Sequence, residues 1–238
     1  MKGFSPDAAL QSEYLLKGLS MLGYDAVNLA VKDFHLGGKY LMNMSQKYRL
    51  TFVSANVRYF PEDKPFVEPF VLKKLSANPQ KGSPPFEKLT VGIFGLCDER
   101  ESLYQEQAGE SKLISRDPVQ AAQKVVAEMA KADLIILLYN GRYVVLQELL
   151  SKVPNIDIVI VGGEYYKVEP SNNRIPIIVT TPSLGKYFGE LRITLNDRKK
   201  ILNYNTFRYP LDESIADDPK LSRLVDEFLQ AQAKISAE

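Results

Sequence analysis

Several side chains that could take part in chemistry stand directly after apolar segments, where active-site residues of α/β proteins lie. Carboxylate, imidazole and amide donors gathered from such positions could hold a divalent cation. Their spacing matches no metal-binding motif, and the chain has a single histidine. A lone histidine is more often a surface or hydrogen-bonded residue than a metal ligand, so the residues by themselves favour a polar cleft over a metal site. The candidates are Asp33, His35, Asn140 and Glu164.

The only cysteine, Cys97, ends the apolar segment 91–96 and precedes Asp98, Glu99 and Arg100. Most free cysteines are buried and unreactive, and that interpretation comes first. The alternative is a reactive thiol at a strand end, serving a thiol or redox enzyme. Arg100 would lower the pKa of such a thiol, whereas the two carboxylates would raise it. One cysteine excludes an internal disulfide.

Helix signals recur along the chain. Ser5-Pro6-Asp7 predicts the start of a helix, because Ser caps the first turn and Pro is favoured at its first position. Gly23 predicts its end, because Gly readily adopts the backbone conformation that terminates a helix. Asp117-Pro118 opens a second helix that runs to Lys131, and Asp218-Pro219 opens the last one. A further helix is expected near residues 40–44.

Apolar runs between these helices predict strands. Segments 133–138 and 157–161 are continuously apolar, as expected of strands covered on both faces. Segments 193–195 and 201–202 flank the Asn196-Asp197 turn and predict a hairpin. Val27 to Ala30 predicts a short strand. The pattern indicates one α/β domain over residues 1–238, with helices layered outside packed sheets.

Composition excludes some partners. The chain has 30 basic and 29 acidic residues, so no net field favours nucleic acid or an anionic membrane. No run of about 18 apolar residues predicts a membrane span. No signal peptide is visible at the start of the chain, so the sequence leaves the compartment unknown.

Segments of this chain resemble, in order, those of the 5′-nucleotidase / 2′,3′-cyclic phosphodiesterase family of calcineurin-like metallophosphatases. Gly23-Tyr24-Asp25-Ala26-Val27 resembles the family's signature strand, and the match runs on through Phe34. The resemblance implies a metallo-dependent phosphatase-like fold, a layered sandwich of two mixed β-sheets flanked by helices. It also implies that two N-terminal metal-binding strands are missing, and that relatives are often periplasmic or extracellular. The further matching segments are 52–57, 88–96, 117–122, 132–138, 158–163, 176–179 and 185–191.

The departures from that family fall on its ligand positions. Val31 and Lys32 stand where the family has Asn and His, and Asn140 stands where it has His. Gly163 is followed by Glu164, Tyr165 and Tyr166 in place of a His-x-His motif. Val binds no metal and protonated Lys is no ligand, so we expect the family's two divalent metals to be absent and no cofactor to be bound. The expected cleft consists of Val31, Lys32, Asp33, His35, Asn140, Glu164 and Tyr166.

Lys32 has two possible roles. It is either a solvated residue at a strand end or a cation that replaces metal charge, ion-paired with Asp33 or Glu164 or holding an anionic ligand. The aromatic residues Tyr139, Tyr143, Tyr165 and Tyr166 would either fill the cleft or form a binding surface. We therefore expect a non-catalytic protein that binds an unknown small ligand or protein at this cleft. The alternatives are a phosphoric ester hydrolase completed by N-terminal strands and a thiol enzyme using Cys97.

Overall fold

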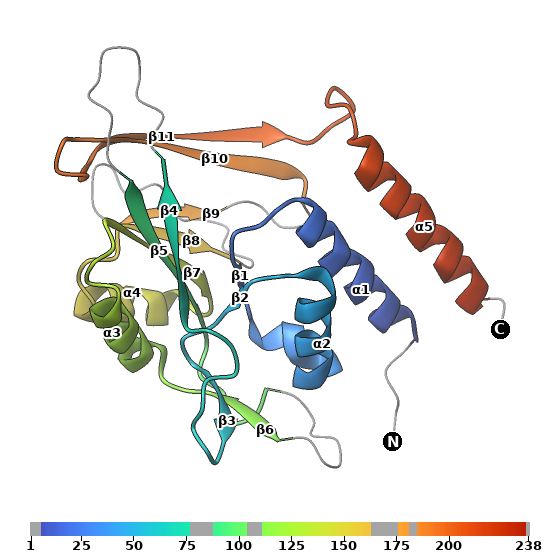
Figure 1. Ribbon diagram of the computed structural model, residues 1–238, viewed down its shortest axis with the longest axis horizontal. Coiled ribbons are helices and arrows are strands. Elements are labelled where there is room, and N and C mark those ends of the chain that lie inside the picture. Colours follow the sequence, from blue (N-terminus) through green and yellow to red (C-terminus); the bar gives the residue numbers. More distant parts are fainter. Residues whose placement is uncertain (1–5, 77–87, 104–110, 163–175, 181–184, 237–238) are drawn as a thin grey trace.

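A computed structural model describes residues 6–76, 88–103, 111–162, 176–180 and 185–236. Its centre is a five-stranded sheet in the order β4-β5-β7-β8-β9 (Figure 1). The strands are β4 (Phe70–Leu75), β5 (Leu89–Cys97), β7 (Leu134–Asn140), β8 (Ile158–Val161) and β9 (Ile177–Thr180). Only β4 runs antiparallel to its neighbour, and the other four are parallel. The two apolar runs predicted as strands are β7 and β8, which confirms both.

Helices α3 (Pro118–Glu128) and α4 (Tyr143–Lys152) cover one face of this sheet. The predicted cap of α3 is confirmed, since the Asp117 carboxylate accepts the backbone N–H of Val119 at 2.8 Å. The apolar residues of the two helices pack with alternate residues of β5, β7 and β8 into one buried cluster. Strand residues that lie between these point to the opposite face.

Short strand pairs lie elsewhere on the fold. Strand β1 (Val27–Asn28) pairs in parallel with β2 (Phe52–Val53), and β3 (Val57–Phe60) pairs antiparallel with β6 (Lys112–Ser115). The predicted hairpin is confirmed and longer than expected, with β10 (Tyr187–Leu195) and β11 (Ile201–Pro210). The mixed α/β class is therefore correct. The expected second sheet consists, in the described residues, of separate two-stranded pairs.

The remaining helices lie on the side of β1 and β2. They are α1 (Pro6–Met21), the 3₁₀ helix η1 (Val31–Leu36), α2 (Gly38–Tyr48) and α5 (Pro219–Ser236). In Figure 1, α5 lies along α1 at the edge of the molecule. The Lys17–Glu227 ion pair, with 2.8 Å between Nζ and Oε2, and the Tyr14–Phe228 ring contact at 5.5 Å join the two helices. Within the described ranges, no helix has the length and apolar character that crossing a bilayer requires.

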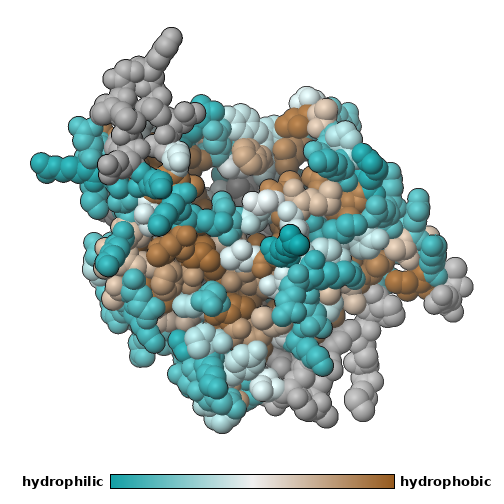
Figure 2. All heavy atoms as spheres, viewed as in Figure 1, coloured by the Kyte–Doolittle hydropathy of each residue, from teal (hydrophilic) through white to brown (hydrophobic). Residues whose placement is uncertain are grey.

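Apolar side chains reach the surface in several places. Figure 2 shows brown, apolar atoms among the hydrophilic ones over the central sheet and near α1 and α5. The largest exposed fractions near these elements belong to Leu15, Leu22, Leu72, Val225 and Leu229. Scattered exposed leucines are normal for a globular protein, so these alone assign no interface.

Candidate functional site

The candidate site lies at the carboxyl ends of the parallel strands. Cys97 ends β5 and Asn140 ends β7, and the two are direct neighbours in the strand register. Strand β1 packs over β5 and β7 and leads into η1, which carries Val31 to His35. The carboxyl edge of a parallel sheet is where α/β proteins bind ligands. The fold therefore brings the β1–η1 segment to the edge that also holds Asn140.

The η1 helix is fixed by one buried aromatic residue. Phe34 is fully buried and contacts the Phe66 ring, with 5.5 Å between ring centroids in an edge-to-face arrangement. Its neighbours Lys32, Asp33 and His35 are exposed as a consequence, whereas Val31 is half-buried against the same cluster. Phe34 thus places the polar residues of the expected cleft at the surface.

The polar groups of η1 bond within their own turn. The Asp33 carboxylate accepts the backbone N–H of Ala30 at 2.7 Å, as a capping residue does. His35 Nδ1 lies 3.0 Å from the Lys32 carbonyl oxygen, and because a carbonyl only accepts, Nδ1 carries the proton in this arrangement. Asp33 is exposed as a residue, but its carboxyl is turned back towards Ala30. Desolvation of this carboxyl raises the pKa of Asp33 above its usual value, against the opposing effects of the Ala30 N–H and His35.

The Lys32 ammonium does not pair as expected. No carboxylate of the described residues, Asp33 included, forms an ion pair with it. Of the two predicted partners, Asp33 does not pair with Lys32, because it turns back to cap its own helix, and the pairing with Glu164 stays a prediction. The other predicted partner, Glu164, lies outside the described residues, as do Tyr165 and Tyr166.

A buried carboxylate that the sequence analysis treated only as a neighbour of Cys97 organises the ends of β5 and β7. Asp98 accepts the backbone N–H of Arg142 at 2.9 Å, and its Oδ2 lies 3.4 Å from Arg142 Nε. The Tyr139 hydroxyl donates to the Arg142 carbonyl at 3.0 Å. Gly141 lies between them, where a Cβ would come within 2.5 Å of Asp98 Oδ1. The sequence signal for this arrangement was an acidic residue, Asp98, directly after one strand, together with the Gly141-Arg142 pair directly after the neighbouring strand.

Tyr139 and Tyr143 do not share one aromatic surface. Tyr139 is buried in the cluster beneath α3 and α4, and Tyr143 is exposed at the start of α4. Tyr139 therefore contributes to the core beneath the helices, and neither interpretation, filling of the cleft or a binding surface, describes it.

Cys97 is fully buried in the second hydrophobic cluster. Burial raises the pKa of its thiol to about 12, although a hydrogen bond with Ser115 acts in the opposite direction. The nearby carboxylates Asp98 and Asp33 raise the pKa further, and only Arg100 lowers it by its charge. A protonated thiol without access to solvent is a poor nucleophile. The structure therefore matches the unreactive interpretation and gives the thiol-enzyme alternative no support.

Two asparagine amides, which the sequence analysis did not single out, hold the strands at this edge. The Asn56 amide donates to the carbonyls of Cys97 at 2.8 Å and Arg116 at 2.9 Å, and its oxygen accepts the Cys97 N–H at 3.2 Å. The Asn28 amide donates to the Leu96 carbonyl at 2.9 Å. An amide side chain in an otherwise apolar segment was the sequence signal for both residues.

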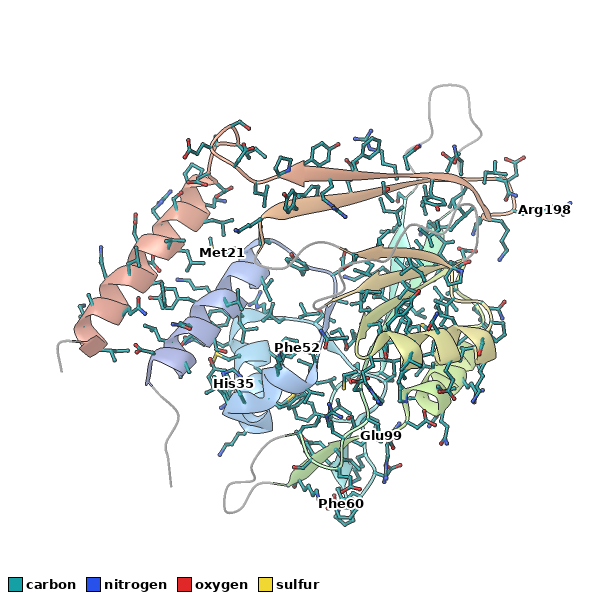
Figure 3. All side chains as sticks on the ribbon, turned by 180° about the vertical axis from the view of Figure 1, so that it is seen from behind. Met21, His35, Phe52, Phe60, Glu99 and Arg198 are labelled. Carbon is teal, nitrogen blue, oxygen red and sulfur yellow. The ribbon has the colours of Figure 1, made fainter. Side chains whose placement is uncertain are left out.

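Within the part of the chain that the structure describes, no three His, Cys, Asp or Glu side chains form a group that could hold a metal ion. Asp33 and Asp98 are engaged with backbone N–H groups, and His35 is engaged with a carbonyl. Figure 3 shows His35 beside α2 and Glu99 near the β3–β6 pair, so these two residues do not approach each other. The described donors therefore do not fit a two-metal centre.

Comparison with known proteins finds phosphoesterases among the sequences and structures that are similar to this chain. No family model matches the sequence. A 2′,3′-cyclic-nucleotide 2′-phosphodiesterase/3′-nucleotidase of Haemophilus influenzae is 27% identical over 158 residues, which cover 62% of this chain and 24% of the relative. The trifunctional nucleotide phosphoesterase YfkN of Bacillus subtilis is 27% identical over 246 residues, covering 90% of this chain and 17% of that protein. The chain thus spans about a quarter or less of these two relatives.

Solved structures share the fold. The calcineurin-like phosphoesterase YfkN of Bacillus subtilis aligns with a TM-score of 0.74 at 19% identity, covering 99% of this chain and 79% of that one. The sulfate thiohydrolase SoxB of Thermus thermophilus aligns with a TM-score of 0.78 at 16% identity, covering 97% and 41%. The sequence relatives are therefore nucleotide phosphoesterases, and the solved structures that share the fold include a calcineurin-like phosphoesterase, a 5′-nucleotidase and a thiohydrolase.

Proposed function

We propose that this chain is a non-catalytic module with a phosphoesterase fold, which binds a ligand or partner at the carboxyl edge of its sheet. One observation carries the proposal. In the described residues, the carboxylates of Asp33 and Asp98 near this edge accept backbone N–H groups of Ala30 and Arg142. One oxygen of each carboxylate is thus committed to the backbone, which leaves the group less available as a metal ligand or a base than an unengaged carboxylate would be.

The exposed charges at the edge favour an anionic ligand. Lys32 follows β1 and Arg142 follows β7, and both side chains are exposed. Strands β1 and β7 pack against each other, and Asp33, next to Lys32, is near enough to affect the pKa of Cys97, the register partner of Asn140, so the two following loops lie at the same edge. Ammonium and guanidinium groups are the usual partners of phosphate and carboxylate. The ligand class is therefore an anion such as a phosphate or a carboxylate.

A second candidate is a phosphoester hydrolase, which the names of the homologues favour. It requires metal ligands from residues or segments other than those described. A thiol enzyme is not supported, because Cys97 is buried and its burial raises the pKa of the thiol to about 12.

The test combines metal content, turnover and binding. The purified protein is dialysed against Mn²⁺ and assayed by elemental analysis and with bis(p-nitrophenyl) phosphate and AMP. We expect no stoichiometric metal and no turnover above a heat-denatured sample. Calorimetric titration with AMP should show binding that Lys32→Met weakens and Lys124→Met, a control on the exposed face of α3, does not. Stoichiometric metal together with metal-dependent turnover would establish the hydrolase instead.

A further inference from the structure

A cavity of about 470 Å³ lies at the amino ends of the parallel strands, opposite to the candidate site. Asp133 precedes β7 and Asp157 precedes β8, and both residues line the cavity. The turn between β10 and β11 lies beside them and contributes Lys200. Figure 3 shows Arg198, in the same turn, on the other side of the molecule from His35 of η1. The cavity is therefore separate from the proposed anion site.

The walls of this cavity are mostly apolar. The end of α3 and the residues that follow it contribute Val126, Ala127 and Ala130, and the segment between α4 and β8 contributes Val153 and Pro154. Small-molecule sites in proteins commonly enclose about 300–1,000 Å³ and have mainly apolar walls with a few polar groups. The cavity falls within this range and can hold an aliphatic side chain.

The hairpin turn that borders the cavity is fixed to the central sheet. Lys199 Nζ lies 3.0 Å from Asp133 Oδ2 and 3.3 Å from the Lys88 carbonyl oxygen. Within the turn, the side-chain oxygen of Asn196 accepts the backbone N–H of Lys200 at 2.9 Å. Asp133 thus already has a cationic partner, and the backbone of Lys200 is held at the border of the cavity.

Two charged groups on the cavity form no ion pair within the part of the chain that the structure describes. Asp157 Oδ2 accepts the Ile135 N–H at 2.8 Å, but neither this carboxylate nor the Lys200 ammonium has an ionic partner there. Desolvation raises the pKa of Asp157, against the opposing effects of the Ile135 N–H and the Lys200 charge. The two charges are therefore near each other without being in contact.

A ligand of this cavity meets two opposite charges and an apolar wall at once. A simple anion would lie beside the Asp157 carboxylate and a simple cation beside the Lys200 ammonium, and like charges repel each other. A wholly apolar molecule would remove both charged groups from water without giving them a partner. A molecule with an ammonium group and a carboxylate group satisfies both. Free α-amino acids carry these two groups, and the aliphatic ones carry an apolar side chain as well.

We propose that the cavity binds a free α-amino acid with an aliphatic side chain. The ammonium group of the ligand donates to Asp157, its carboxylate accepts from Lys200, and its side chain contacts Val126, Ala127 and Pro154. Charge-assisted hydrogen bonds at both ends orient the ligand. Burial of its side chain adds apolar contact. The site shares no residue with the carboxyl edge, so it is independent of the proposed function.

The test is calorimetric titration of the full chain with L-leucine. We expect saturable binding that Asp157→Asn and Lys200→Met each weaken at least about tenfold. The Asp157→Asn side chain keeps an oxygen that can accept the Ile135 N–H. Asp197→Asn and Arg198→Met are the matched controls, because both residues are exposed in the same turn, and they should leave binding unchanged.

A further variant changes the apolar wall and no charged group. Ala127 is exposed on α3, so Ala127→Leu should be tolerated by the fold and should weaken leucine binding by filling part of the cavity. Equal melting temperatures establish that all the variants fold. Leucine binding that all three cavity variants leave unchanged would overturn the proposal.

Two analogues of leucine separate the contributions of its charges. Isocaproate lacks the ammonium group and isoamylamine lacks the carboxylate, and each should bind at least about tenfold more weakly than leucine. Equal binding of either analogue would overturn the assignment of an amino acid. Absence of leucine binding would overturn the proposal outright. Leucine binding that Lys32→Met abolishes would place the ligand at the carboxyl edge and would overturn it as well.

Discussion

Alkylation of Cys97 tests the environment at the carboxyl edge, because the chain has no other cysteine and any label reports this residue. A free thiol with a pKa of about 8.5 is roughly one quarter thiolate at pH 8. The Cys97 thiol, with a pKa of about 12, is thiolate to only about one part in 10⁴ at that pH. The thiolate is the reacting species, so the folded protein should react about three orders of magnitude more slowly than the free thiol.

The assay follows iodoacetamide labelling by mass spectrometry between pH 6 and pH 10. The same protein in guanidinium chloride is the control, since its thiol is exposed and otherwise identical. We expect complete labelling of the denatured protein while the folded protein stays largely unlabelled. A folded-state rate within about tenfold of the control at pH 8 would refute both the burial and the raised pKa.

The same thiol makes stability depend on pH. Its pKa in the folded state is above that in the unfolded state, so the folded state holds the proton more tightly. The corresponding stability is fully present below about pH 8.5 and is lost as pH rises towards 12, by at most about 1.4 kcal/mol per pH unit. Cys97→Ser should flatten the curve of unfolding free energy over this window, and a curve identical to that of the unmodified protein would contradict the raised pKa.

Two further predictions concern packing at the same edge. Gly95→Ala should lower the free energy of unfolding in urea by about 1–3 kcal/mol relative to Gly162→Ala. The new Cβ at position 95 would lie 2.7 Å from the Val53 carbonyl oxygen, whereas the nearest atom at Gly162 is at an ordinary 3.5 Å. Equal free energies for the two variants would mean that β1 and β2 do not pack directly on β5. Asp98→Ala should lower the free energy of unfolding by about 1–3 kcal/mol, since it leaves the Arg142 N–H without its acceptor. Arg142→Ala removes only an exposed guanidinium and should lower it by at most about 1 kcal/mol. The reverse order in urea unfolding would show that the ion pair, and not the hydrogen bond to the backbone, stabilises this edge.

The elements with strong local signals were predictable from the sequence. The Asp117-Pro118 cap, the two apolar strands and the turn at Asn196-Asp197 each fix structure through neighbouring residues, and all appear as expected. The short strand predicted over Val27 to Ala30 was only half right. The strand ends at Asn28, and the chain soon enters η1, where Phe34 is buried in the core.

The candidate site was less predictable, because its bonds depend on which groups the fold brings within reach. Asp33 could have paired with Lys32, but the Ala30 N–H lies within its own turn and needs an acceptor. The role of Asp98 depends on Arg142, which follows a different strand. The depth of Cys97 depends on Asn56 and the cluster around Phe34, and no local pattern contains that information.

The side-chain amides of Asn28 and Asn56 explain how strands as short as β1 and β2 keep their place. Each strand is two residues long, too short for its own ladder to hold it firmly. The amides act as additional rungs, tying these segments to the carbonyls of Leu96 and Cys97. They are uncharged, so these ties do not vary with pH. The polar residues of the loops that follow can consequently be substituted while the framework beneath them stays the same. The fold can therefore be kept when the chemistry of the site changes.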